Sequence, residues 1–295
     1  MCIVNPRGSL VLVCLFLLFS ITSSCQKSVG HIESEFLETP SITPLSTIIQ
    51  ESSGVADSRI NPGYLWVVED SGNPPRLSLL GHDGKILKTV YIRSAINHDW
   101  EEMTIAKGPD PALDYLYVAD IGDNGNVNPS CTIYRFPEPS KTADTVRIYD
   151  KIVFQYPDGA HDAEAFLVDD VSKDIIIITK RDKSSRVYRL PGNYSTSTTN
   201  TLEFVTELSY NGVTGAAISP DGRDILVKTY TKIFHYSRTP GITIAQALKT
   251  TAVMAPYRLE PQGEAVCFAL DNSGYYTLSE KGISTSVSLY FYKRK

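Results

Sequence analysis

His98-Asp99-Trp100-Glu101-Glu102-Met103 is one of five related segments that recur along this chain and indicate its fold. His161-Asp162-Ala163-Glu164-Ala165-Phe166 repeats its pattern H-D-x-E. The other three members are Gln50-Glu51-Ser52-Ser53-Gly54-Val55, Gly212-Val213-Thr214-Gly215-Ala216-Ala217 and Gln262-Gly263-Glu264-Ala265-Val266. When Ser53, Glu101, Glu164, Thr214 and Glu264 are taken as equivalent head residues, the repeats are spaced by 48, 63, 50 and 50 residues. Short-strand repeats of about this length predict a β-propeller.

Each repeat continues with the pattern of a small β-sheet. Every second residue after the head is apolar, as Phe166 and Val168 are after Glu164. A period of two is that of a strand. A turn follows, and then a strongly apolar second strand, expected at residues 64–68, 115–119, 175–179, 225–228 and 275–278. Outer strands are expected at residues 76–80, 86–92, 132–136, 146–155, 186–190 and 202–208, and a short helix in place of a blade edge at 241–249.

The number of repeats predicts an all-β, five-bladed propeller, with a six-bladed ring as the alternative. The last repeat ends after its third strand, at residues 287–292. Residues 46–50, which precede the first head, are expected to supply the missing fourth strand. This pairing would close the ring and remove an open sheet edge. A sixth blade would need a further repeat.

Composition agrees with a single β domain over residues 46–295. The chain contains 17 Tyr and 10 Phe, which favour strands. Its formal net charge is −5 and its basic clusters are short, so a nucleic-acid polymer is not expected as a partner. The domain is expected to be a monomer. Cys131 and Cys267 are expected to be buried thiols, with a disulfide as the alternative.

Residues 1–24 are expected to be a signal peptide. Arg7 precedes an apolar run at residues 10–19, which is too short to span a bilayer stably. Small residues stand directly before Cys25, as in bacterial lipoprotein signals, so we expect Cys25 to be lipidated and residues 25–45 to form a polar tether. This predicts a lipid-anchored protein of the bacterial cell envelope, outside the cytoplasm. Ordinary secretion and a retained anchor helix are the alternatives.

The five head residues are expected to meet on the propeller axis. Three are carboxylates and two are hydroxyls: Glu101, Glu164, Glu264, Ser53 and Thr214. Ca²⁺ takes six to eight oxygen ligands of this kind, whereas zinc would prefer His or Cys. The sequence therefore predicts a central Ca²⁺. Glu102 is the alternative to Glu101, and in another interpretation one or two of the glutamates cap backbone N–H groups instead.

A second group of polar residues follows the second strands. Asp70 and Asp120 lie at the ends of the first two, and Lys180 and Lys228 at the ends of the next two. Carboxylates near a metal, opposed by lysines, suit a small anionic or phosphorylated ligand. In that interpretation the two Asp residues position or deprotonate water, and the two Lys residues stabilise anionic oxygen. The alternative is that these residues form ordinary polar turns.

The heads resemble a known family. Ser53-Gly54, the Glu-x-Met-Thr-Ile sequence that starts at Glu101, and the heads Glu164, Thr214 and Glu264 are similar to the central pattern of calcium-activated nucleotidases of the apyrase type. The resemblance implies a secreted five-bladed propeller in which Ser and Glu from successive blades surround one Ca²⁺. Thr214 departs from the family pattern, which has Ser there. The heads resemble phytase-like propellers more loosely, and those usually have six blades.

These features predict a Ca²⁺-dependent hydrolase of phosphate esters or anhydrides. Two other classes stay open. One is a non-catalytic propeller, in which calcium pins the blades together and a face binds a glycan, peptide or protein. The other is a glycosidase, because five-bladed propellers can centre several carboxylates. Lysines beside the acids favour phosphate, whereas a glycan-binding face would expose Trp, and the chain has only Trp66 and Trp100.

Overall fold

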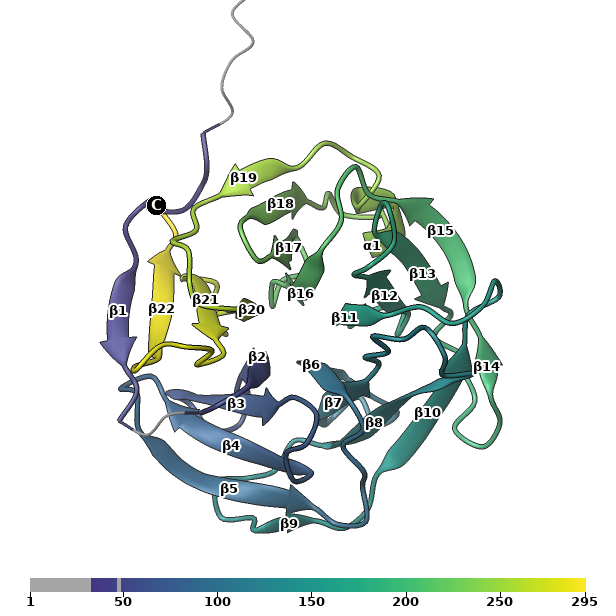
Figure 1. The fold of residues 1–295 in the computed structure, drawn as a ribbon, viewed down its shortest axis with the longest axis horizontal. Coiled ribbons are helices and arrows are strands. Elements are labelled where there is room, and N and C mark those ends of the chain that lie inside the picture. The colour runs from purple at the N-terminus through teal and green to yellow at the C-terminus, as the bar shows by residue number, and fades with distance from the viewer. Residues whose placement is uncertain (1–32, 47–48) are drawn as a thin grey trace, which may run out of the picture. The chain divides into compact units, whose positions relative to one another are not determined.

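Each repeat of the sequence folds into one mainly antiparallel sheet, because its apolar strands pair with their neighbours along the chain. The computed structural model describes residues 33–46 and 49–295, and in this part of the chain five sheets surround a common axis (Figure 1). The predicted five-bladed β-propeller is confirmed, and the six-bladed alternative is wrong. The predicted signal peptide and the lipidation of Cys25 lie outside the described residues.

The blades follow one another in sequence. Blade one contains β2 (Ser52–Asp57), β3 (Tyr64–Glu69), β4 (Arg76–Gly81) and β5 (Ile86–Ile92). Blade two contains β6 (Trp100–Lys107), β7 (Asp114–Asp120), β8 (Cys131–Pro137) and β10 (Asp150–Gln155). Blade three contains β11 (Ala163–Val168), β12 (Ile175–Thr179), β13 (Arg186–Leu190) and β15 (Glu203–Glu207). Blade four contains β16 (Val213–Ile218), β17 (Asp224–Thr229), β18 (Ile233–Ser237) and β19 (Val253–Ala255). Blade five contains β20 (Gly263–Phe268), β21 (Gly274–Ser279), β22 (Ser288–Lys293) and β1 (Ser41–Pro44).

The core lies between the blades. The first strand of each blade is nearest the axis, and the second strand is covered on both faces, as β12 shows with every residue buried (Figure 1). Trp66 and Trp100 pack in the cluster between blades one and two and are fully buried. Large aromatic rings of this kind dominate the apolar area removed from water. Neither Trp therefore offers the exposed ring that a glycan-binding face would use.

One of the predicted fourth strands is divided between neighbouring blades, and a short strand directly precedes another. The strand predicted at residues 146–155 begins as β9 (Thr145–Val146), which pairs in parallel with β5, and continues as β10 in blade two. Likewise, β14 (Asn200–Thr201) pairs in parallel with β10, whereas β15 belongs to blade three. Each short strand covers the open edge of the preceding blade, which protects that edge from pairing with another chain.

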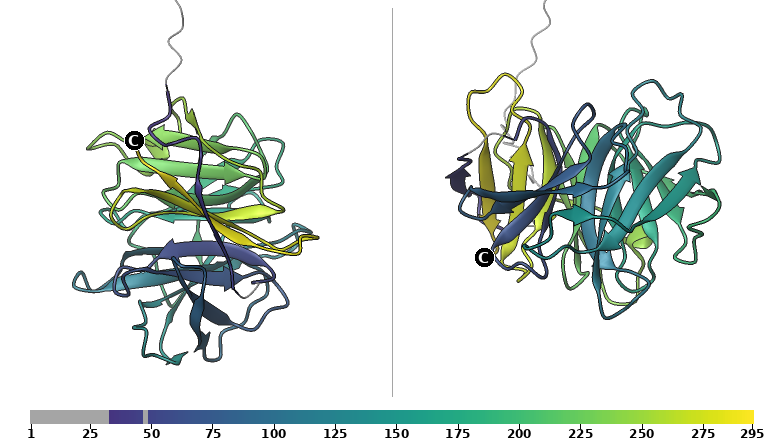
Figure 2. Two further views of the ribbon diagram at one scale, coloured as in Figure 1. Left: turned by 90° about the vertical axis from the view of Figure 1, so that its left-hand side faces the viewer. Right: turned by 90° about the horizontal axis from the view of Figure 1, so that it is seen from below.

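The ring is closed by a strand that lies earlier in the chain than predicted. β1 pairs antiparallel with β22 and supplies the strand that was predicted at residues 46–50, of which 47 and 48 lie outside the described residues (Figure 1 and Figure 2). Upstream of β1, Phe36 forms a β-bridge with Arg294, and its side chain is fully buried. Residues 33–45, predicted as part of a polar tether, therefore belong to the propeller, and the boundary predicted at residue 46 is too late. The short, largely exposed sequence of β1 lacks the apolar alternation that would have revealed it.

The predicted helix is present but does not replace a blade edge. Helix α1 (Ile244–Ala247) begins at a capping box formed by Thr243 and Gln246. Strand β19, which follows the helix, pairs with β18 and supplies the fourth strand of blade four.

Two further features concern the cysteines and the membrane. Cys131 and Cys267 are buried and free, as the buried-thiol interpretation predicts. Among the described residues, none of the helical structure has both the length and the apolar character that crossing a membrane requires.

Removal of residues 33–44 is expected to destabilise the propeller. The deletion unpairs β22 and exposes the pocket of Phe36, and loss of a buried Phe side chain alone costs about 3–5 kcal/mol. A protein that starts at Glu33 is the control and should melt like the longer chain. Thermal unfolding followed by circular dichroism compares them, and equal melting temperatures for the two truncations would refute the closing role of β1.

Candidate metal centre

Each inner strand begins with a β-bulge at its head residue. In blade two the pairing of β6 with β7 passes from Trp100 to Glu102, so Glu101 is the extra residue. The same shift occurs at the other four heads, Ser53, Glu164, Thr214 and Glu264. A bulge redirects the side chain of its extra residue. The five heads therefore occupy equivalent positions at the end of the axis where the inner strands begin, and we call this group the axial site.

The three glutamates of the axial site converge. One carboxylate oxygen from each of Glu101, Glu164 and Glu264 lies within 4.8 Å of the others. Each of these residues is only 4% exposed. Burial and, after it, the charge of a neighbouring head carboxylate raise the pKa of both Glu101 and Glu164 well above the usual value. The group thus combines a small volume, little exposure and three carboxyl groups that cannot all ionise without a compensating cation.

Several oxygen atoms of the axial site have no partner within residues 33–46 and 49–295. Glu164 Oε2 and Thr214 Oγ1 are buried without a hydrogen bond among the described residues. The Glu101 carboxylate also forms no hydrogen bond or ion pair within that part of the chain. Ser53 donates its hydroxyl proton to the Trp100 carbonyl at 2.7 Å, which leaves its lone pairs free. Unpaired buried oxygen atoms are rare in folded proteins, and this set matches the ligands of a hard cation such as Ca²⁺.

Lys180 supplies positive charge at the axial site. Its ammonium group pairs with Glu164 Oε1 and donates to the Tyr230 hydroxyl at 2.9 Å. Tyr230 in turn donates to Glu264 Oε1 at 2.8 Å. This chain of contacts satisfies one oxygen of each of two glutamates. One ammonium group nevertheless faces three carboxylates, so the group retains an excess of negative charge.

In each blade the second strand pairs with the inner strand. The residue that directly follows the last of these pairs belongs to a second ring. The strand registers give these positions as Asp70, Ile121, Lys180, Tyr230 and Glu280. Asp70 and Lys180, two of the four residues predicted to act on a ligand, lie in this ring.

Asp120 and Lys228, the other two, lie one and two positions earlier and do not join the ring. Asp120 accepts from the Asp99 N–H at 2.9 Å and from His98 at 3.1 Å, so it holds the loop before β6. Lys228 is fully buried, donates to the Gly263 carbonyl and lies 4.5 Å from the centroid of the Tyr257 ring. A shift of one residue along a strand sends the side chain to the other face, which explains the place of Asp120. Lys228 lies two residues back, inside the paired part of β17, where its ammonium group is held by the Gly263 carbonyl.

Three residues near the axial site were missed in the sequence. Asp99 lies beside Asp70, and burial followed by the hydrogen bond to Asp70 raises the pKa of Asp99 to about 7. Glu280 lies beside Glu264, and burial followed by the charge of Glu264 raises the pKa of Glu280 to about 8. Tyr230 is the third. The H-D-x-E pattern already marked Asp99, but Glu280 and Tyr230 emerge only when the strand register is known.

Glu102 caps backbone N–H groups, which is the role that the alternative interpretation gave to one or two of the glutamates. Its carboxylate is completely buried and accepts from the backbone N–H of Met103 at 2.9 Å and of Ala216 at 3.1 Å. The second contact reaches from blade two to β16 in blade four. A Cβ atom on Gly215 would lie 2.6 Å from the Glu264 carbonyl, so glycine is required at this approach. Glu101, rather than Glu102, therefore joins Glu164 and Glu264.

Comparisons with known proteins identify no family for this chain. No protein-family model matches the chain, and no curated protein is significantly similar to it. A similar solved structure is the β-propeller domain of Cps50 (Swd1) from Myceliophteria thermophila. The two share 10% sequence identity at a TM-score of 0.42, over 83% of this chain and 85% of the other.

In metal-free buffer, the free energy of unfolding is expected to fall as the pH rises from about 5 to 8. The folded-state pKa values of Asp99, about 7, and Glu280, about 8, lie above their usual values. Such groups contribute stability that is complete below the unfolded pKa and is lost as the pH rises through the folded pKa. Urea unfolding at several pH values measures the slope. The double variant Asp99→Asn/Glu280→Gln should reduce the slope, and the raised pKa values of Glu101 and Glu164 should maintain the remainder. A flat profile in the unmodified protein would contradict the expectation.

Proposed function

We propose that this protein is a Ca²⁺-dependent hydrolase of phosphate esters or anhydrides, with the ion held by the axial site. The observation that carries the proposal is the convergence of three buried carboxylates, together with unpartnered oxygen atoms on Glu164 and Thr214. Glu101, Glu164 and Glu264 would hold the ion directly or through water, and Ser53 and Thr214 would add hydroxyl oxygens. A bound cation would polarise a phosphoryl oxygen.

Ca²⁺ fits this group better than the other common divalent ions. Every donor atom of the axial site is oxygen, whereas zinc sites use His and Cys. Mg²⁺ keeps several of its waters and binds through one or two carboxylates, but the axial site offers three carboxylates and two hydroxyls with little exposure. Ca²⁺ accepts six to eight oxygen ligands in flexible geometry.

The residues around the axial site favour a phosphorylated ligand. Lys180 places an ammonium group next to the carboxylates. Arg181, the next residue along the chain, has a side chain that is 48% exposed and pairs with Asp162 at 2.6 Å. Both cations suit phosphoryl oxygens. Asp70 is half-buried, so water can reach its carboxylate, and it would orient or deprotonate the attacking water. The resemblance of the heads to calcium-activated nucleotidases points to the same class of substrate.

A non-catalytic propeller with a structural calcium is the second candidate. It is favoured by the low exposure of the three glutamates and by the commitment of Lys180 to Glu164 and Tyr230. In this case the ion would join strands of three blades, and a ligand or partner would bind elsewhere. Hydrolysis measured on a protein that binds Ca²⁺ separates the two candidates.

Ca²⁺ is expected to stabilise the folded protein. An ion that binds only the folded state at a hundredfold excess over its dissociation constant adds about 2.7 kcal/mol. For a domain of this size that raises the melting temperature by about 5–10 °C. Glu164→Gln and Glu264→Gln should each reduce the rise, because each removes a negatively charged ligand, and Mg²⁺ should produce a smaller one. Glu203→Gln, an exposed carboxylate on β15, is the matched control and should retain the full rise. A melting temperature that does not respond to Ca²⁺ would remove the axial ion.

The reaction itself is tested with a panel of phosphate monoesters, nucleoside diphosphates and nucleoside triphosphates. Release of phosphate should require Ca²⁺ and stop after addition of EDTA. Asp70→Asn should lower kcat about 100-fold, as loss of a proton-transferring group does, whereas Glu203→Gln should leave it unchanged. Bound Ca²⁺ without hydrolysis of any member of the panel would favour the non-catalytic propeller.

We further propose that the protein is anchored outside the cytoplasm by a lipid on Cys25. Small residues directly before this Cys, at the end of a short apolar run, support the proposal. Cys25→Ser should abolish the incorporation of labelled fatty acid and move the protein from the membrane fraction to the soluble fraction. Cys131→Ser, a buried thiol, serves as the control. Unchanged fractionation of Cys25→Ser, with a mature N-terminus at another residue, would exclude the anchor.

A further inference from the structure

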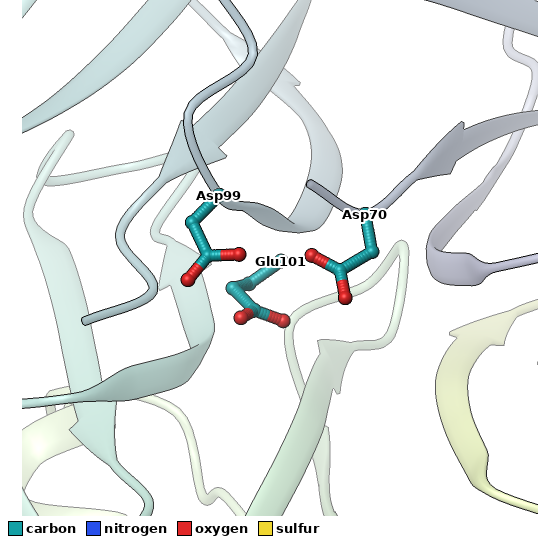
Figure 3. A group of neighbouring side chains, drawn as sticks. All are labelled: Asp70, Asp99 and Glu101. Atoms are coloured by element: carbon teal, nitrogen blue, oxygen red, sulfur yellow. The ribbon is translucent and has the colours of Figure 1, made fainter. Parts of the chain in front are cut away.

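A second group of carboxylates adjoins the axial site. Asp70, which follows β3, and Asp99, which precedes β6, point toward Glu101 (Figure 3). One oxygen atom of each of the three residues lies within 4.8 Å of the others. We call this the outer group. It shares Glu101 with the axial site but draws its other members from loops of blades one and two.

The outer group is built to keep these carboxylates together. Asp70 accepts from the backbone N–H of Ser71 at its own turn. The Asp99 carbonyl accepts from the backbone N–H groups of Ile121 and Gly122, both at 3.2 Å, so the loop that bears Asp99 is fixed. A Cβ atom on Gly122 would lie directly against Asp99 Oδ2 and Glu101 Oε1. Glycine at this position is therefore what allows the two carboxylates to approach.

Glu101 gives independent evidence for a ligand. It is 4% exposed, and its carboxylate has no hydrogen-bond or ion-pair partner among the described residues. It belongs to both groups, because a carboxylate oxygen of Glu101 lies within 4.8 Å of oxygen atoms of Glu164 and Glu264 and also of Asp70 and Asp99. A buried carboxylate without a protein partner requires another partner, and a shared carboxylate can bridge two cations.

The balance of charge also calls for more than one ion. Asp70, Asp99, Glu101, Glu164 and Glu264 form one group through the shared Glu101, Lys180 pairs with Glu164, and Glu280 shares a hydrogen bond and its proton with Glu264. When all five carboxylates are ionised, one divalent cation still leaves two negative charges. A second divalent cation neutralises the group. A site that is to receive an anionic ligand must first lose this excess of negative charge.

We propose that this end of the propeller holds two divalent cations bridged by Glu101, the inner ion in the axial site and the outer ion between Asp70, Asp99 and Glu101. The inner ion is that of the proposed function, on which this inference rests. Asp70 and Asp99 are only half-buried, so the outer ion has coordination positions open to water. Of the two ions, the outer one would therefore contact the phosphoryl group, and Asp70 would orient the attacking water as a ligand of that ion.

The test counts the ions. The purified protein, loaded with Ca²⁺, should carry two ions in native mass spectrometry and show two binding events in calorimetry. Asp99→Asn should carry one ion and keep most of the Ca²⁺-dependent rise in melting temperature, because the axial site is intact. Glu101→Gln should weaken both binding events. Asp83→Asn, an exposed turn carboxylate, is the matched control and should still carry two ions.

A second measurement detects the pair of ions in the unmodified protein directly. The unmodified protein loaded with Mn²⁺ should give an exchange-coupled electron paramagnetic resonance spectrum, because ions that share one carboxylate lie about 3.5–4 Å apart. Asp99→Asn should restore the six-line spectrum of isolated Mn²⁺, and Gly122→Ala replaces it if that variant fails to fold. One ion and no coupling in the unmodified protein would overturn the outer site and leave the proposed function standing. No bound ion would overturn both.

Discussion

The mutual repulsion of carboxylates at the axis is the constraint on which the rest of this site depends. Propeller closure brings five inner strands together, and the bulge at each start turns its head residue toward the same small volume. Two unit charges about 5 Å apart repel by about 3 kcal/mol at an effective dielectric constant of 20. Glu101, Glu164 and Glu264 experience this repulsion pairwise while removed from water. Such an arrangement persists only when protons or cations compensate for it.

The blades contribute unequally to this compensation. Blade four supplies no carboxylate to either ring, and its Thr214 and Tyr230 are neutral. Blade three supplies the ammonium of Lys180. Tyr230 accepts a hydrogen bond from this ammonium and donates one to Glu264. The excess of acid therefore lies toward blades one, two and five. A regular five-fold ring would repel itself on every side, whereas this ring has one side on which charge is already balanced.

Sequence alone predicts the parts of this architecture that repeat. The blade count, the inner strands and the five equivalent heads follow from period and alternation. Strand β1 escapes detection because its residues are mostly exposed and carry no apolar pattern. Glu280 and Tyr230 escape it because they reach the axial site only through the register that the bulges set. Asp120 and Lys228 lie outside the second ring for a related reason, since counting along the chain cannot tell which residue of a polar strand end faces the axis.

Glu102 has a consequence for the width of the axial site. Its carboxylate reaches from β6 to the backbone of β16, two inner strands of different blades. The side chain is completely buried, so water does not compete for this hydrogen bond. Because β6 carries Glu101 and β16 carries Thr214, the bond fixes the spacing of these two head residues. A site of fixed width distinguishes cations by their size.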